Sequence, residues 1–125
     1  MATVIHTTSA PAAVGPYSQA MDCGAFVFCS DQIPLVPETG IMVEGGIEAQ
    51  TRQMFANIKA VLNAAGLDFS NVVKTTVFMT DLSQFATFNG IYAEYFPENP
   101  PARSCVEVSK LPKGAMVECE VIAKR

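Results

Sequence analysis

Runs of β-branched or alternating residues near both ends of the chain predict β-strands. They occupy residues 17–23, 25–30, 71–81, 102–109 and 115–124. The first two runs flank the turn-like triplet Asp22, Cys23 and Gly24, which predicts a hairpin. The last two runs are joined by residues 110–114, where proline and glycine favour a turn.

Apolar residues at helical spacing predict two amphipathic helices between these strands. The first stripe ends before Gly66, in the position that favours glycine after a helix C-terminus. We expect Asp81 to cap the second helix and Pro97 to follow its end. The element order β, β, α, β, α, β, β predicts an α+β fold, with one face of the sheet covered by both helices. The two stripes are Ile47, Met54, Ile58, Val61, Leu62 and Ala65, and Phe85, Phe88, Tyr92 and Phe96.

The last two predicted strands carry polar residues at every second position. Their valines, among them Val106 and Val121, are expected to face the helices. The opposite face would then carry Arg103, Cys105 and Glu107 on one strand and Met116, Glu118 and Glu120 on the other. We expect these second faces to meet between subunits and to form clefts there.

Composition limits the class of protein. The chain has 125 residues, half of them hydrophobic, which suits one domain over residues 1–125. Charged residues make up only 16% and the mean hydropathy is +0.26, so we expect a homo-oligomer. The net charge of −4 and the lack of a basic run argue against nucleic acid as a partner.

The sequence also disfavours a membrane protein, a secreted protein and a metal site. The apolar runs are too short to span a bilayer and no secretory signal is evident, which predicts a cytoplasmic protein without a membrane partner. The four cysteines form no CxxC pair, and His6 is the only histidine. A metal site is therefore not expected, and the thiols are interpreted as free.

Arg103 is the first candidate for binding chemistry. An ion pair with Glu118 or Glu120 is the ordinary interpretation of a strand arginine. The alternative is an anion receptor, since a guanidinium binds a carboxylate through two parallel hydrogen bonds. Such a receptor gives orientation, and a proton-transfer partner is still required for chemistry.

Three other side chains each allow a structural and a functional interpretation. Glu118 can relay protons if its pocket is partly dry, or it can be an ordinary solvent-facing residue. Cys105 has no histidine beside it in sequence, which favours a buried, non-catalytic thiol. Tyr17 follows Gly15 and Pro16 at the start of a strand, where a structural and a functional role are both open.

Four of the most distinctive segments of the chain are "APAAVGPYSQA", "CSDQIP", "VVKTTVFMTDLSQFATFN" and "PPARSCVEVSKLPKGAMVECE". With these segments, nearly the whole chain resembles the RidA (YjgF) family of enamine and imine deaminases. The resemblance implies a homotrimer with a chorismate-mutase-like α+β fold and sites in the clefts between subunits. It also implies hydrolysis of 2-aminoacrylate and related enamines or imines to 2-keto acids and ammonia, without a metal or organic cofactor.

The resemblance also implies roles for individual residues. Arg103 would hold the substrate carboxylate, and Glu118 would position and activate the attacking water. The backbone of Cys105 would help to place that water. Tyr17, Ser30 and Asn89 would line the pocket, together with Asp31, which stands where the family usually has glycine.

Two other functions remain open at this point. The same pocket could bind a 2-keto acid or an amino-acid metabolite without turnover, and Asp31 motivates that alternative because it adds a negative charge beside an anion site. Ribonuclease or translation-inhibitor activity has been attributed to some relatives, and the acidic composition of this chain argues against it.

Overall fold

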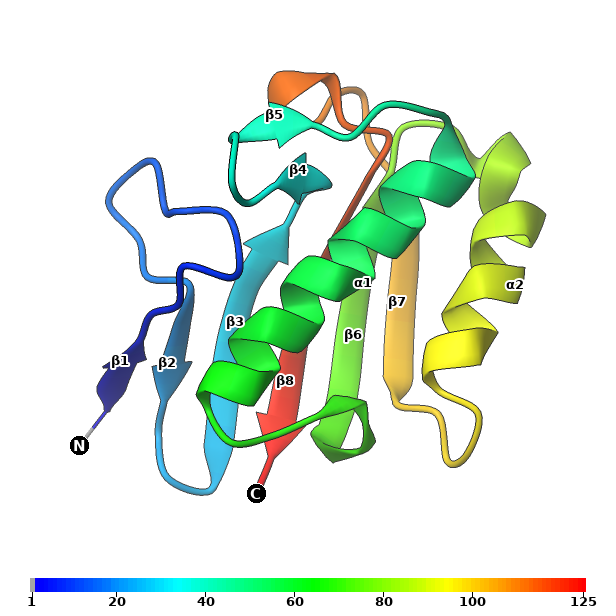
Figure 1. Cartoon of the computed structure of the whole chain (residues 1–125). Coiled ribbons are helices and arrows are strands. Elements are labelled where there is room, and N and C mark those ends of the chain that lie inside the picture. Colours follow the sequence, from blue (N-terminus) through cyan, green and yellow to red (C-terminus); the bar gives the residue numbers. More distant parts are fainter. Residues whose placement is uncertain (1) are drawn as a thin grey trace.

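In the computed structural model, which describes residues 2–125, a six-stranded mixed sheet carries two helices on one side (Figure 1). The strand order is β1-β2-β3-β8-β6-β7, and only β6 and β7 run parallel. The strands are β1 (Thr3–Ile5), β2 (Ala20–Asp22), β3 (Phe26–Gln32), β6 (Val72–Met79), β7 (Ala102–Glu107) and β8 (Val117–Lys124). The helices are α1 (Ile47–Ala64) and α2 (Phe85–Tyr95).

The local signal for the end of α1 is confirmed. Gly66 adopts a φ of 76° just beyond α1, a conformation that glycine adopts without steric cost. Asp81 accepts a hydrogen bond from the Ser83 backbone N–H at 2.9 Å, but it caps the 3₁₀ turn η2 (Leu82–Gln84) that precedes α2, and the N-cap of α2 itself is Gln84. The predicted α+β fold with both helices on one face is likewise confirmed.

The core lies between the helices and the covered face of the sheet. Phe55 of α1 is fully buried and stacks against Phe88 of α2, with ring centroids 6.5 Å apart. From the sheet, Val77 and Val121 are buried beneath them. This burial of large apolar side chains is the main source of the fold's stability.

Two parts of the fold were absent from the sequence prediction. β1 pairs with β2 at the edge of the sheet, and a separate hairpin is formed by β4 (Leu35–Val36) and β5 (Ile41–Met42). Such short strands lack the length over which alternation can be recognised. The predicted strand 17–23 is also shorter, because residues before Ala20 form an irregular loop.

The predicted facing of the strand at 102–109 is wrong. In the parallel pair, Arg103 lies opposite Thr75 and Cys105 opposite Val77, and both partners are fully buried on the covered face. Arg103 and Cys105 therefore point toward α2, whereas Val106 is 44% exposed on the uncovered face. The positions of the valines predicted the wrong facing of this strand, because the uncovered face is itself rich in apolar residues, including Phe26 and Phe28.

The two final strands are also not neighbours. β6 lies between β7 and β8, so the turn around η3 (Pro112–Gly114) crosses over one strand. Glu118 and Glu120 do lie on the uncovered face, as predicted, because Cys119 and Val121 alternate with them into the core. Within residues 2–125, no helix has the length and apolar character that a membrane crossing requires.

Candidate functional site

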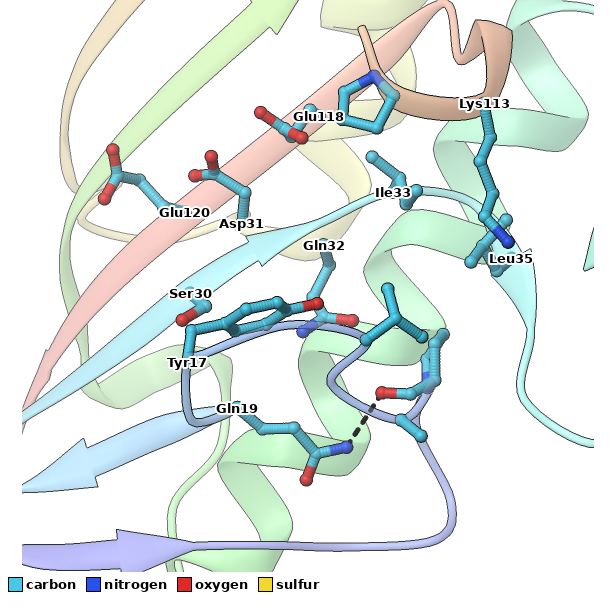
Figure 2. Close-up of a pocket in the computed structure, with 14 residues that line it drawn as sticks. Tyr17, Gln19, Ser30, Asp31, Gln32, Ile33, Leu35, Lys113, Glu118 and Glu120 are labelled. Carbon is cyan, nitrogen blue, oxygen red and sulfur yellow. Dashed lines mark hydrogen bonds between the residues drawn. The ribbon is translucent and has the colours of Figure 1, made fainter. Parts of the chain in front are cut away.

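A cavity of about 480 Å³ opens on the uncovered side of the sheet (Figure 2). Four of the predicted site residues line it, and they come from the loop before β2, from β3 and from β8. These four are Tyr17, Ser30, Asp31 and Glu118. Residues outside the predicted site also contribute, among them Gln19, Lys113 and Glu120.

Gln19 holds the loop that carries Tyr17. Its amide is 2% exposed, accepts a hydrogen bond from the Thr7 N–H at 2.7 Å and donates to the carbonyls of Thr7 and Pro11 at 3.0 and 2.9 Å. Figure 2 shows the bond to Pro11 as a dashed line. A buried amide that satisfies several backbone groups fixes a loop without regular structure. Tyr17 remains half-exposed at the mouth of the cavity.

Two polar residues of α1 fix the opposite wall. Asn57 is fully buried and donates to the Ile33 and Leu35 carbonyls at 3.1 and 2.9 Å. Gln50 accepts from the Met116 N–H at 2.8 Å, just before β8 begins. These bonds connect the helix-covered core to the segments around the cavity. Polar residues within an otherwise apolar helix face were the available sequence signal for this role.

A β-bulge aims Ser30 and Asp31 at the cavity. Cys29 pairs with Val121, but Gln32 pairs with Cys119, so β3 has one extra residue between these pairs. A bulge of this kind places two successive side chains on one face of the sheet. The Ser30 hydroxyl then donates to the Ser18 carbonyl at 2.7 Å, and Asp31 is the second polar side chain that the bulge brings to the cavity.

Glu118 is the most perturbed carboxyl in the cavity. It is 9% exposed, and burial raises its pKa to about 8, with further contributions from a hydrogen bond to Asp31 and from the charges of Asp31 and Glu120. The pKa of Glu120 is raised as well, first by burial and then by Asp31. Glu118 is therefore mainly protonated at neutral pH, and it can give up a proton before it accepts one.

Arg103 lies in a different group, beside α2. Its guanidinium donates to Asn89 Oδ1 at 2.7 Å and stacks on Tyr92 and Phe85, with Cζ 4.6 and 5.3 Å from the ring centroids. Tyr92 is itself held by a 2.8 Å hydrogen bond between its hydroxyl and that of Thr75. The expected ion pair with Glu118 or Glu120 is absent within residues 2–125, and no other ion pair there involves Arg103.

Cys105 follows Arg103 on the same side of β7. It is partly buried against the core, and this burial raises the pKa of its thiol. The protonated thiol is a poor nucleophile. His6 is far from it in the topology, since it lies just after the edge strand β1, whereas β7 forms the opposite edge of the sheet.

The predicted site residues thus form two groups on opposite faces of one sheet. Arg103, Asn89 and Cys105 lie on the α2 side, and Tyr17, Ser30, Asp31 and Glu118 lie around the cavity. One chain does not bring Arg103 and Glu118 together. The aromatic residues Phe85 and Tyr92 were predicted as part of the helix stripe, and nothing in their spacing marked them as supports for an arginine.

The sequence model of the family described as Endoribonuclease L-PSP matches residues 7–125. The chain belongs to this family, which is also called the Rid or YjgF family. Among curated relatives in the Rid family, the 2-iminobutanoate/2-iminopropanoate deaminase of Salmonella typhimurium is 50% identical over 100% of this chain and 99% of its own.

Solved structures of other Rid family members have the same fold. A Rid family protein from Yersinia pestis is 51% identical with a TM-score of 0.95, and each chain is covered completely. TdcF from E. coli, whose crystal structure contains bound serine, is 44% identical with a TM-score of 0.94 over 98% of both chains. The agreement extends over at least 98% of this chain.

Proposed function

We propose that this Rid family protein hydrolyses 2-aminoacrylate and related enamines or imines to 2-keto acids and ammonia. The observation that carries the proposal is a guanidinium without a carboxylate partner in residues 2–125, together with an acid-form glutamate in a separate cavity. One group suits the substrate carboxylate and the other suits proton transfer. The 50% identity to the Salmonella deaminase supports the same chemistry.

Arg103 is the proposed carboxylate anchor. Asn89 and Tyr92 hold its guanidinium in place before any ligand arrives, so little conformational entropy is lost on binding. A charge-assisted hydrogen bond contributes about 1.5–3 kcal/mol, and a bidentate pair adds directionality. The relative TdcF has been solved with bound serine, a small molecule that also carries a carboxylate.

Glu118 is the proposed proton relay. In its acid form it protonates the nitrogen of a neutral imine, or the methylene carbon of an enamine, and so makes C2 electrophilic. The resulting carboxylate takes a proton from the attacking water as the C2–O bond forms. The proton then passes to nitrogen, the C–N bond breaks with release of ammonia, and the hydroxyl proton of the forming keto acid restores the acid form of Glu118.

We further propose that three copies assemble through their uncovered faces. Within one chain the sheet separates Arg103 from Glu118, so a complete site requires Arg103 of one copy and Glu118 of the next. The exposed Phe26 and Phe28 support an association through this face, since monomers rarely expose such apolar patches. Tyr17, Ser30 and Asp31 would line the cleft, and the Cys105 backbone would help to place the water.

The first experiment generates 2-iminopropionate with an amino-acid oxidase and follows its trapping by semicarbazide. Wild-type protein is expected to consume the imine before it is trapped. Arg103→Ala should lower kcat/KM roughly 10²-fold or more through loss of the carboxylate anchor. Arg52→Ala is the matched control, because Arg52 is an α1 surface arginine paired with Glu94 and should keep full activity.

Mixing two inactive variants tests the shared site. When Arg103→Ala and Glu118→Ala are unfolded together and refolded as mixed oligomers, about one quarter of the clefts regain both residues. Recovery of activity in the mixture supports a site between copies. A mixture as inactive as its components contradicts that arrangement, even if the wild type is a deaminase.

Two alternative functions predict different results in experiments on the same purified protein. Binding of a 2-keto acid without hydrolysis of any imine would favour a metabolite sensor, which the negative charge of Asp31 in the cavity motivates. A ribonuclease would cleave RNA in step with the purified oligomer, which we do not expect from a chain with net charge −4. The cytoplasmic location and independence from metals and organic cofactors stay predictions.

A further inference from the structure

Asp31 brings an additional carboxyl group next to Glu118. The bulge in β3 places Asp31 on the uncovered face beside Glu118 and Glu120 of β8, and Figure 2 shows the Asp31 carboxyl between the two glutamates. Both carboxyl groups line the same cavity, and the side chain of Asp31 contributes to the raised pKa of Glu118. Two carboxyl groups that meet in this way can form a hydrogen bond only if one of them carries a proton, because two carboxylates offer acceptors alone.

The other groups around Glu118 do not provide that proton or neutralise the pair. β6 contributes the apolar Phe78 directly opposite Glu118, and the loop before β2 contributes Tyr17. Lys113 of η3 is the one basic side chain among the residues that line the cavity, and Glu120 adds a further negative charge. In the proposed assembly, Arg103 of a neighbouring copy would approach as the substrate anchor.

We propose that Asp31 and Glu118 share one proton across the β3 bulge, and that Asp31 is the positioning residue which, in addition to burial, keeps that proton on Glu118 before substrate binds. This inference deepens the proposed deaminase and rests on it for the catalytic consequence. The resting state would then be ready to protonate a neutral imine or an enamine. Glycine at this position would leave Glu118 without its partner.

The reaction needs the acid form of Glu118, and the loss of that form should limit the rate at high pH. Above the pKa of Glu118 the carboxylate cannot protonate the substrate, so kcat/KM should fall as pH rises through that value. Removing Asp31 removes both a hydrogen bond that favours the protonated form and a like charge that disfavours the ionised form. The fall should therefore begin at a lower pH in Asp31→Gly.

The test measures the titration of Glu118 directly, without substrate. The intact protein is labelled with ¹³C at the glutamate carboxyl carbons, and the Glu118 signal is assigned by its absence in Glu118→Gln. Wild type is expected to titrate well above an ordinary glutamate, and Asp31→Gly about one pH unit lower or more. Asp31→Asn should also titrate lower than wild type, because the asparagine amide donates to the ionised carboxylate and adds no charge.

Glu120→Gln is the matched control, since Glu120 acts on Glu118 only through its charge. It should shift the Glu118 midpoint less than Asp31→Gly does. Equal midpoints in wild type and Asp31→Gly would overturn proton sharing, whether or not the protein is a deaminase.

A pH profile of kcat/KM then links the pair to the reaction. Its alkaline limb should move in Asp31→Gly by the same amount as the titration midpoint. If the midpoint moves but no imine is hydrolysed by any variant, the proposed function fails while the proton sharing stands. A midpoint that moves while the alkaline limb of an active enzyme stays fixed would overturn the catalytic role of Asp31.

Discussion

Both faces of the sheet carry apolar residues, but the helices cover only one of the two faces. On the covered face, Val77 and Val121 are closed off by the helices and are at most 1% exposed. On the uncovered face, Phe28 and Val106 are 46% and 44% exposed, and Glu118 and Glu120 lie on the same face. The first face stabilises the single chain, whereas the second suits contact with another copy around a polar cleft.

The largest difference between the two faces is expected when a valine on each face is replaced by aspartate. Val77→Asp should abolish folding, because an unpaired charge in the core costs at least about 4–5 kcal/mol, a large part of a domain's stability. Val106→Asp is expected to leave the helical circular dichroism intact, yet to shift the protein to monomers without imine hydrolysis. Gel filtration and circular dichroism measure both outcomes.

Val77 and Val106 are well matched for this comparison because they lie at adjacent positions of the β6–β7 pair. If Val106→Asp unfolded the chain as completely as Val77→Asp, the uncovered face would belong to the folding core. If it remained fully assembled and active, the proposed interface would lie elsewhere.

A smaller effect concerns the carboxyl buried on the uncovered face. The pKa of Glu118 is raised from 4.5 to about 8, so its contribution to stability is complete below pH 4.5 and is lost as pH rises through 8. Glu118→Gln, which stays neutral, should therefore melt above wild type at pH 9 and close to it at pH 5.

The same variant should lose imine hydrolysis by roughly 10²-fold or more, since the amide cannot relay a proton. Thermal melts at one protein concentration give the comparison, because assembly makes Tm depend on concentration. A Glu118→Gln protein that is less stable than wild type at both pH values would indicate a structural glutamate, held by bonds that glutamine cannot replace.

The smallest effect is expected at Cys105 on the covered face. Its thiol is protonated at neutral pH because burial raises its pKa, and only its backbone is proposed to touch the water. Cys105→Ala should retain kcat/KM within about threefold, with a modest loss of stability from the removed sulfur. A loss as large as that of Arg103→Ala in the imine assay would instead assign chemistry to the thiol.

Sequence patterns predicted the elements better than the facing of their residues. The stripe from Ile47 predicted α1 and the stripe from Phe85 predicted α2, because helix periodicity is a local property. The orientation of Arg103 depends on its pairing with Thr75 of β6, which is distant in sequence. Alternation along a strand gives two possible facings, and an apolar second face removes the signal that distinguishes them.

Some features of the candidate site could be predicted from local sequence, whereas others depend on contacts between residues that are distant in sequence. Residue types and the family resemblance singled out Tyr17, Asp31, Arg103 and Glu118. The bulge that aims Asp31 at Glu118 could not be predicted, because it exists only in the register between β3 and β8. Gln19 and Asn57 were missed for a related reason, since each acts through bonds to backbone groups that only the fold brings near.

The place of β8 in the sheet also bears on how the chain is made. β8 holds residues 117–124 yet pairs with β3 on one side and β6 on the other, so it joins two parts of the sheet that otherwise do not touch. During synthesis from the N-terminus, those parts lack their common neighbour until residues 117–124 have left the ribosome. The complete sheet, the cavity and any assembly through the uncovered face can therefore form only after β8 has been synthesised.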